Sequence, residues 1–302
     1  MKATVNIQTI AAAAVVERNW LSICAELFKA RLTGLVLMTT LVGFYMGTVG
    51  RIDYARLLHT MMGTALLASG ASALNQLWER DHDARMQRTR NRPLPAGQLQ
   101  PRFVLWIGSA LSLLGLADLA LAVNWITTLL GACTLIIYLL LYTPLKRVTW
   151  LNTIVGAVPG ALPPLMGWTA VRGGLSAESA VLFGILALWQ LPHFMAIAWI
   201  YRDEYARAGF KMLSVVDPTG CRTARLALVC AVALLGASIC PWLMGMAGSF
   251  YLAAGLILGV IFLGTAIEFA RCLTICRARQ LFLASILYLP LLLAAMVVAR
   301  SQ

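Results

Sequence analysis

Nine long apolar runs dominate the sequence, and they constrain the fold more than any other feature. The hydrocarbon core of a bilayer is about 30 Å thick, and a helix needs roughly 20 apolar residues to cross it. The runs are continuous and do not alternate in polarity, so they predict helices rather than the strands of a membrane β-barrel. The expected spans are residues 32–49, 57–78, 103–122, 125–142, 150–171, 178–200, 224–246, 250–269 and 280–299.

The composition supports the same fold class. Of the 302 residues, 60% are hydrophobic and only 12% are charged, and the mean hydropathy is +0.80. A soluble globular domain carries about 25% charged residues. We therefore predict an all-α integral membrane protein in which nine transmembrane helices form one bundle over residues 31–302. Residues 1–30 are expected to form an N-terminal cytoplasmic arm.

The distribution of basic residues predicts the orientation in the membrane. If the N-terminus is cytoplasmic, only four of the 24 lysines and arginines lie outside, namely Arg51, Arg56, Arg172 and Arg300. This bias follows the positive-inside rule and places the C-terminus outside. The expected location is an inner (cytoplasmic) membrane. The net charge of +12 then belongs to the cytoplasmic surface of the protein, next to the membrane. Binding to nucleic acid is not needed to explain this charge.

A dense group of charges, "NQLWERDHDARMQRTRNRPL", begins at the end of the second run. Within it Asn75, Glu79 and Asp83 are spaced four residues apart, so a helix that continues past the run carries them in one stripe about 12 Å long. Oxygen ligands in such a row suit Mg²⁺, which commonly bridges carboxylates to substrate phosphates. The alternative is a solvated loop in which the acids merely neutralise the arginines that follow.

A second charged group ends the sixth run in a similar way. It contains Asp203 and Glu204 within "WQLPHFMAIAWIYRDEYARAGFKML", residues 189–213. The second and sixth spans are four helices apart and run in the same direction, so both groups emerge on one side of the membrane. Two acidic groups that face one cavity can hold a diphosphate through metal ions, which favours a site over a solvated loop.

Three stretches of the sequence resemble motifs of a known protein family. The pattern N-x-x-x-[DE]-x-x-x-D at residues 75–83 resembles the first aspartate-rich motif of the UbiA superfamily of intramembrane prenyltransferases. Together with "YTPLKRVTWLNTIVGAVPGALPPLMGW", the two charged stretches are similar to the family of protoheme IX farnesyltransferases, or haem O synthases. The resemblance covers roughly residues 25–300. It implies a nine-helix fold that transfers a farnesyl group from farnesyl diphosphate to the 2-vinyl group of haem b, with addition of water, to give haem O and diphosphate.

The resemblance also implies roles for individual residues. Asn75, Glu79 and Asp83 match the first metal motif and are expected to bind Mg²⁺ directly or through water. Glu204 matches an acid of the second metal motif, which is usually D-x-x-x-D. Here only one acid can lie on the required face, so the second motif departs from that pattern. The basic positions that are expected to hold the diphosphate are Arg31, Arg88, Arg92 and Lys146.

The porphyrin would require further contacts, and His193 is the only histidine deep in an expected span. A neutral imidazole there could ligate or stack on haem, or it could be a hydrogen-bonded core residue. Trp189 could line the porphyrin site or belong to an interfacial belt, and Tyr201 could contact substrate or anchor the interface. Arg202 is included among the expected substrate-binding residues.

Two other functions share some of these features. A prenyltransferase with an aromatic acceptor such as a hydroxybenzoate would have the same metal stripe. A transporter would instead show inverted repeats, broken helices and polar groups near the membrane midplane, whereas the charged groups here gather at one face. The expected partner is a haem A synthase or an oxidase assembly factor.

Overall fold

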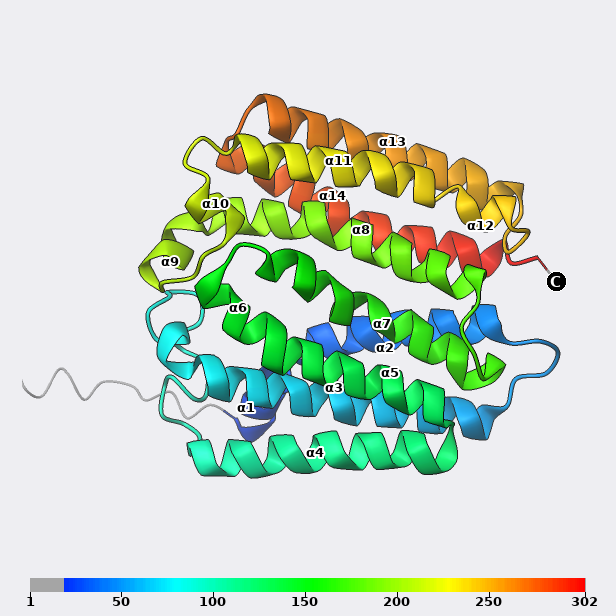
Figure 1. Ribbon diagram of the computed structural model, residues 1–302, viewed down its shortest axis with the longest axis horizontal. Helices are drawn as coiled ribbons and strands as arrows, with labels where there is room; N and C mark the ends of the chain where they lie inside the picture. The colour runs from blue at the N-terminus through cyan, green and yellow to red at the C-terminus, as the bar shows by residue number, and fades with distance from the viewer. Residues whose placement is uncertain (1–18, 302) are drawn as a thin grey trace, which may run out of the picture.

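The computed structural model describes residues 19–301 and is almost entirely helical (Figure 1). In that part of the chain, nine helices are long and apolar enough to cross a membrane, which confirms the predicted fold class. Seven are single helices and two are composite. The single ones are α2 (Ala30–Gly47), α3 (Tyr54–Asp83), α4 (Pro101–Ala122), α7 (Asn152–Arg172), α8 (Ala177–Ile200), α13 (Ser249–Arg271) and α14 (Ile275–Val298).

The two composite spans contain a change of helix type or a short break. The fourth span runs from α5 (Trp125–Ile136) through a π-helical turn, η2 (Ile137–Tyr142), into α6 (Thr143–Val148). The seventh joins α11 (Cys221–Ala237) to α12 (Cys240–Leu243). Three short helices, α1 (Trp20–Leu27), α9 (Arg202–Arg207) and α10 (Leu213–Val216), lie outside the spans.

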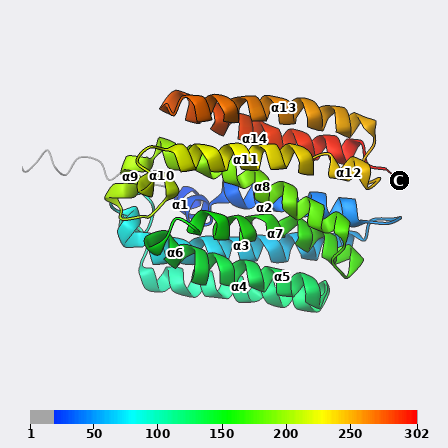
Figure 2. The same cartoon turned by 45° about the horizontal axis from the view of Figure 1, so that its top comes forward.

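The spanning helices lie side by side in a bundle, and α7 runs through its middle (Figures 1 and 2). Helix α7 packs against α2, α5 and α8, while α3 pairs with α4 and α13 pairs with α14. Small residues permit the close contact of α2 with α7. A Cβ on Gly43 would overlap the carbonyl oxygen of Pro164, and one on Gly167 would overlap that of Thr40. The glycines of α7 therefore serve helix packing, as small residues commonly do in membranes.

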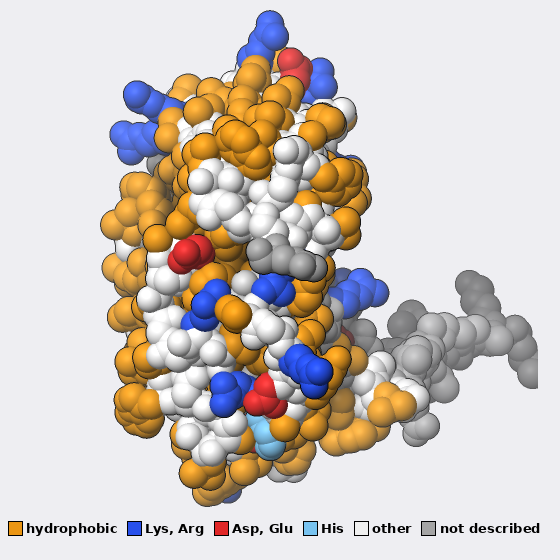
Figure 3. Space-filling model, turned by 90° about the vertical axis from the view of Figure 1, so that its right-hand side faces the viewer, with side chains coloured by type: hydrophobic (Ala, Val, Ile, Leu, Met, Phe, Trp, Pro, Cys, Tyr) orange, Lys and Arg blue, Asp and Glu red, His pale blue; other side chains and the backbone are white. Residues whose placement is uncertain are grey.

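Helices α3 and α8 end at the same end of the bundle, as the sequence predicted (Figure 1). We call this the basic end, and it comprises the segments 84–100 and 201–220 together with the helix termini beside them. The two segments touch, because His82 Nδ1 lies 2.8 Å from the carbonyl oxygen of Ala208 and Met86 packs with Tyr205 and Phe210. At the opposite end, scattered basic and acidic side chains are set among hydrophobic and uncharged ones (Figure 3).

The predicted N-terminal arm comprises residues 1–30, and its residues 1–18 lie outside the described part of the chain. Its described part packs on the bundle. Ile23 and Leu27 of α1 are buried against Ala73 and neighbouring residues. The Gln76 amide of α3 donates hydrogen bonds to the carbonyl oxygens of Glu26 and Leu27, at 2.9 and 2.8 Å. This anchoring holds the start of α2 against α3.

Candidate active site

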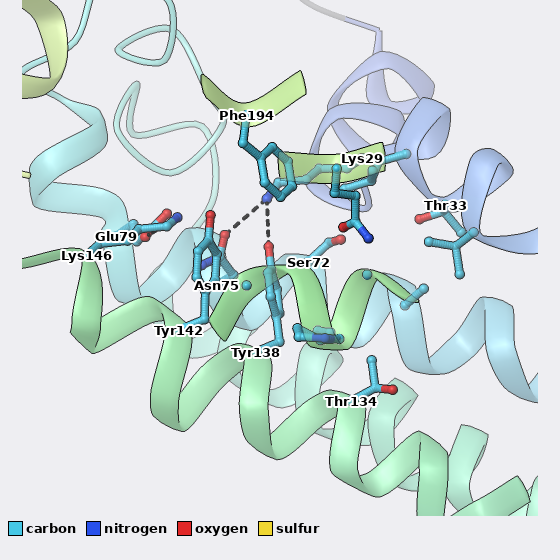
Figure 4. Close-up of a pocket in the computed structure, with 18 of the residues that line it drawn as sticks. Lys29, Thr33, Ser72, Asn75, Glu79, Thr134, Tyr138, Tyr142, Lys146 and Phe194 are labelled. Carbon is cyan, nitrogen blue, oxygen red and sulfur yellow. Dashed lines mark hydrogen bonds and ion pairs between the residues drawn. The ribbon is translucent and has the colours of Figure 1, made fainter. Parts of the chain in front are cut away.

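A cavity of about 480 Å³ opens within the bundle between α2, α3, α5–η2–α6, α7 and α8 (Figure 4). Its part near the basic end is polar and its deeper part is mostly apolar. Six of the predicted site residues line the polar part, namely Asn75, Glu79, Asp83, Arg88, Arg92 and Lys146. The structure thus brings the stripe and three of the four expected diphosphate-binding cations to one cavity.

The stripe lies on the inner face of α3. Asn75, Glu79 and Asp83 are 1%, 4% and 1% exposed, so their polar atoms are withdrawn from the surface. The helix continues beyond the apolar run to Asp83, and the four-residue spacing therefore keeps all three side chains on one face. The alternative of a solvated charged loop is wrong for these three residues.

Each stripe residue meets a cation from another segment. Lys146 Nζ donates to Glu79 Oε1 at 2.8 Å, and Arg92 donates to Asp83 Oδ2 at 2.7 Å. Lys29 Nζ donates to Asn75 Oδ1 at 3.0 Å, as Figure 4 shows. Charge-assisted hydrogen bonds of this kind are stronger than neutral ones. Positive charge is therefore concentrated beside the oxygen atoms that a metal–diphosphate complex would use.

Lys29 was not predicted, although it lines the cavity. It stands in the turn between α1 and α2 with φ 46°, a left-handed conformation that few residues other than glycine adopt. Burial, reinforced by the nearby charges of Arg92 and Lys146, lowers the pKa of Lys29 to about 8. Arg31, two residues later, was the predicted cation, but it is exposed and is not among the lining residues.

Two tyrosines of η2 were also missed. Tyr138 and Tyr142 line the cavity and stack on each other with ring centroids 5.7 Å apart. The Tyr138 hydroxyl accepts from Lys29 Nζ at 3.3 Å, and the Tyr142 ring faces Lys146 Nζ at 4.4 Å. In an α-helix, residues four apart lie on nearly the same face. The π-helical turn changes the directions in which the side chains of η2 point, so α-helical spacing does not predict which of them line the cavity. No residue spacing in the sequence marks such a turn.

Arg88 connects the two segments of the basic end. Its guanidinium lies 4.7 Å from the ring centroid of Tyr201 and 4.6 Å from that of Tyr205. Its backbone N–H donates to Glu204 Oε2 at 3.4 Å. Tyr201 and Glu204 are not among the lining residues, so they reach the cavity only through Arg88. Glu204 as a metal ligand stays a prediction.

Arg202 points along the surface rather than into the cavity. Its guanidinium lies 3.5 Å from Asp203 and 4.9 Å from the ring centroid of Trp199. The Asp203 side chain is 83% exposed. Neither residue is among those that line the cavity.

His193 and Trp189 belong to a cluster between α8 and α14 beside the cavity. The imidazole stacks between the Trp189 and Phe282 rings, with both centroids 5.1 Å away. His193 Nδ1 lies 2.7 Å from Ser285 Oγ. The Ser285 hydroxyl also lies 2.5 Å from the carbonyl oxygen of Phe282. When this hydroxyl donates to that carbonyl, Nδ1–H is the donor in the pair with His193. Nε2 then carries the lone pair, which is the form that ligates a metal.

The donor set of the stripe fits Mg²⁺. Asn75, Glu79 and Asp83 offer only oxygen ligands, which this hard ion prefers. Among residues 19–301, no three His, Cys, Asp or Glu side chains come close enough to hold a metal ion by themselves. Since Mg²⁺ is usually bound by one or two carboxylates together with substrate phosphates and water, the stripe suits an ion that arrives with a diphosphate.

Taken together, the fold and the cavity define a membrane-embedded enzyme site for a substrate with an anionic head and an apolar chain. The comparisons agree with this class. The UbiA prenyltransferase family matches residues 36–297, and the chain belongs to that family.

Named relatives and solved structures extend the comparison. The chain is 48% identical over 284 residues to the protoheme IX farnesyltransferase of Solibacter usitatus, with 91% of this chain and 97% of the relative covered. It is 44% identical over 277 residues to that of Myxococcus xanthus, covering 91% and 93%. A digeranylgeranylglyceryl phosphate synthase superposes with a TM-score of 0.79 at 16% identity, covering 92% and 98%. A UbiA homolog from Archaeoglobus fulgidus bound to DMAPP and Mg²⁺ superposes with a TM-score of 0.63 at 15% identity, covering 90% and 98%.

Proposed function

We propose that this protein transfers the farnesyl group of farnesyl diphosphate to the 2-vinyl group of haem b, with addition of water, to give haem O and diphosphate. One observation carries the proposal. A row of three oxygen-bearing side chains, each beside a cation, stands at the polar mouth of an apolar cavity inside the bundle. The relatives that share 44–48% of their residues with this chain are protoheme IX farnesyltransferases.

The first chemical step is the loss of diphosphate from the farnesyl carbon. The C–O bond breaks and its electron pair leaves with the diphosphate, so the barrier falls when positive charge surrounds the leaving oxygen. Lys29, Arg88, Arg92 and Lys146 supply that charge. Mg²⁺, when bound, would neutralise further diphosphate charge and position it beside Asn75, Glu79 and Asp83.

The second step joins the two substrates. The farnesyl group is left as an allylic cation, and the stacked faces of Tyr138 and Tyr142 are suited to stabilise it, because aromatic faces attract cations. The electron pair of the haem vinyl group forms the new C–C bond. The cation thereby moves to the carbon next to the porphyrin ring, where water adds and releases a proton. No side chain has to abstract a proton from carbon.

Haem needs a position beside the prenyl chain. The cluster of His193 lies seven residues from the end of α8, about 10 Å into the bundle, and Asn75 lies about 12 Å in from the end of α3. The two are therefore at similar depth. Haem that docks at the α8–α14 seam with its iron on His193 Nε2 would present a vinyl group at the level of the polar mouth, next to Trp189.

The proposed orientation follows from charge. The basic end faces the cytoplasm, and the bundle resides in a bacterial inner membrane with the C-terminus outside. Farnesyl diphosphate then reaches the mouth from the cytoplasm, while haem reaches the seam from the bilayer. Transfer of haem O to a haem A synthase or an oxidase assembly factor stays a prediction.

The decisive experiment uses membranes that contain the full chain, incubated with haem b, farnesyl diphosphate and Mg²⁺ and then extracted for pigment analysis. We expect haem O only when all three are present and no product from a Glu79→Gln variant. Prenylation of a hydroxybenzoate in place of haem would support the aromatic-acceptor alternative instead. Absence of product with either acceptor would overturn the proposal.

A further inference from the structure

The cavity continues well beyond its polar mouth along α3. The lining residues of this helix run from Asn75 through Ala71 and Leu67 to Thr64. At 1.5 Å per residue, Leu67 lies about 12 Å from Asn75 and about 18 Å from Glu79 along the helix axis, and Thr64 lies about one turn further. The walls formed by α7 and α5 reach a similar depth. The lining residue farthest from the basic end is Met166 in α7 and Thr134 in α5.

A compact apolar cluster closes the far end of this channel. Leu67, Leu119 and Met166 pack together and are 3%, 0% and 1% exposed. Leu67 and Met166 face the channel, whereas Leu119 is not among the lining residues. Gly131 of α5 stands directly behind them. A Cβ on Gly131 would lie 2.9 Å from Leu67 Cδ2 and 3.3 Å from Met166 Cε, so the glycine leaves room for both side chains to withdraw from the channel.

The channel length matches a prenyl chain of three units. The main chain of a farnesyl group has twelve carbons, and with C–C bonds of about 1.5 Å it extends over roughly 14 Å. With the diphosphate beside Glu79, the roughly 18 Å of channel down to Leu67 accommodates that length. One more isoprene unit adds four main-chain carbons, or roughly 5 Å, and would run into Leu67 and Met166. One unit fewer would leave apolar wall uncovered.

We propose that Leu67 and Met166 form the floor that selects a fifteen-carbon donor, and that Gly131 sets the depth of this floor. The inference rests on the proposed function and adds the residues that decide the donor length. Their side chains touch the end of the prenyl chain remote from the reacting carbon. They therefore discriminate between donors and take no part in the chemistry.

The test is a competition among geranyl, farnesyl and geranylgeranyl diphosphates with haem b and Mg²⁺, using the full chain in membranes. The masses of the prenylated haems give the ratio of kcat/KM for each pair of donors. Leu67→Ala and Met166→Ala should each raise the twenty-carbon to fifteen-carbon ratio about tenfold or more. Gly131→Ala should push both side chains into the channel and shift the preference toward the ten-carbon donor.

Leu119→Ala is the matched control, since it removes the same atoms from the same cluster without touching the channel. It should lower thermal stability as much as Leu67→Ala does and leave the donor ratios unchanged. If Leu67→Ala does not fold, Leu67→Val makes a smaller opening and should shift the ratio in the same direction.

The outcomes separate the two proposals. Wild-type protein that forms no prenylated haem from any donor contradicts the proposed function. Wild-type protein that forms haem O, together with floor variants that keep its donor ratios, contradicts only the assignment of the floor. An equal shift in Leu119→Ala would also overturn it, because general loosening of the cluster would then explain the change.

Discussion

Glu79 and Asp83 are buried inside the bundle, and each sits at hydrogen-bond distance from a cation. An ion left without its partner in such a place costs several kcal/mol. Lys146 and Arg92 therefore serve the folded state as well as substrate binding. Substitution of a single member mixes the two effects, whereas substitution of both members of a pair separates them.

Lys146→Met should leave the Glu79 carboxylate buried and unpaired, and we expect a loss of about 3–5 kcal/mol of stability. The double variant Glu79→Gln/Lys146→Met removes both charges and should recover most of that loss. Neither variant should form haem O. Thermal unfolding in detergent measures the first quantity and pigment analysis the second. Recovery of activity in the double variant would show that the pair is structural only.

The hydrogen bond from His193 to Ser285 should control haem binding through the imidazole tautomer. His193→Ala should remove the absorption features of histidine-ligated haem. Ser285→Ala should weaken them several-fold, because Nδ1–H loses its acceptor and Nε2 is no longer fixed as the ligand. Ser285→Thr keeps the hydroxyl and should restore the spectrum. Unchanged haem spectra in His193→Ala would remove the proposed ligand.

The site residues that the sequence could predict are those whose positions depend on a single helix. Asn75, Glu79 and Asp83 were identified because one helix fixes their common face. Lys29 meets Asn75 across 46 residues of sequence, and Tyr138 depends on a π-helical turn. No short-range pattern encodes either. His193 was singled out, but its stacking on Phe282 needs α14, which follows much later in the chain.

At the scale of the elements, hydropathy located the spans better than it located their ends. The second span was predicted as residues 57–78, whereas α3 extends from Tyr54 to Asp83. The added turns at its end carry polar side chains that the segments of the basic end bury, and this tertiary effect has no trace in hydropathy. Helix α5 was placed correctly at its start, because Asn124 caps it by accepting from the Thr127 N–H at 2.9 Å.

The start of α11 offers a prediction about pH. Burial alone would raise the pKa of the Asp217 carboxyl, but hydrogen bonds from the Thr223 N–H, the Thr219 hydroxyl and the Arg222 N–H hold it below the ordinary 3.8. A carboxyl with a lowered pKa stabilises the fold above its ordinary pKa, and this contribution is lost as pH falls toward the folded-state value.

Asp217→Asn should therefore lower the Tm at pH 7 by a few degrees, equivalent to about 1 kcal/mol. As the pH falls below 3.8 toward the lower folded-state pKa, the variant and the wild type should converge, since the wild-type carboxyl then becomes protonated. Melting curves in detergent across this range measure both. A constant difference at all pH values would mean that the loop geometry, and not the charge, stabilises α11.

At the scale of the whole molecule, we expect the cations beside the stripe to keep the fold stable without a bound metal. Chelation of divalent ions should abolish haem O formation and leave the Tm almost unchanged, because Glu79 and Asp83 keep Lys146 and Arg92 as partners. Return of Mg²⁺ should restore turnover, which an activity assay before and after dialysis measures. A large fall in Tm on chelation would mean that the metal is part of the structure.

The same ion pairs should couple the binding of metal to the binding of diphosphate at the mouth of the cavity. Lys146 and Arg92 can turn toward an incoming anion only if another positive charge replaces them beside Glu79 and Asp83. If metal and diphosphate bind here as proposed, each should raise the other's affinity by one common factor. A lone anion or a lone divalent ion would be held weakly, so the reactive prenyl donor would be engaged only as a complete complex.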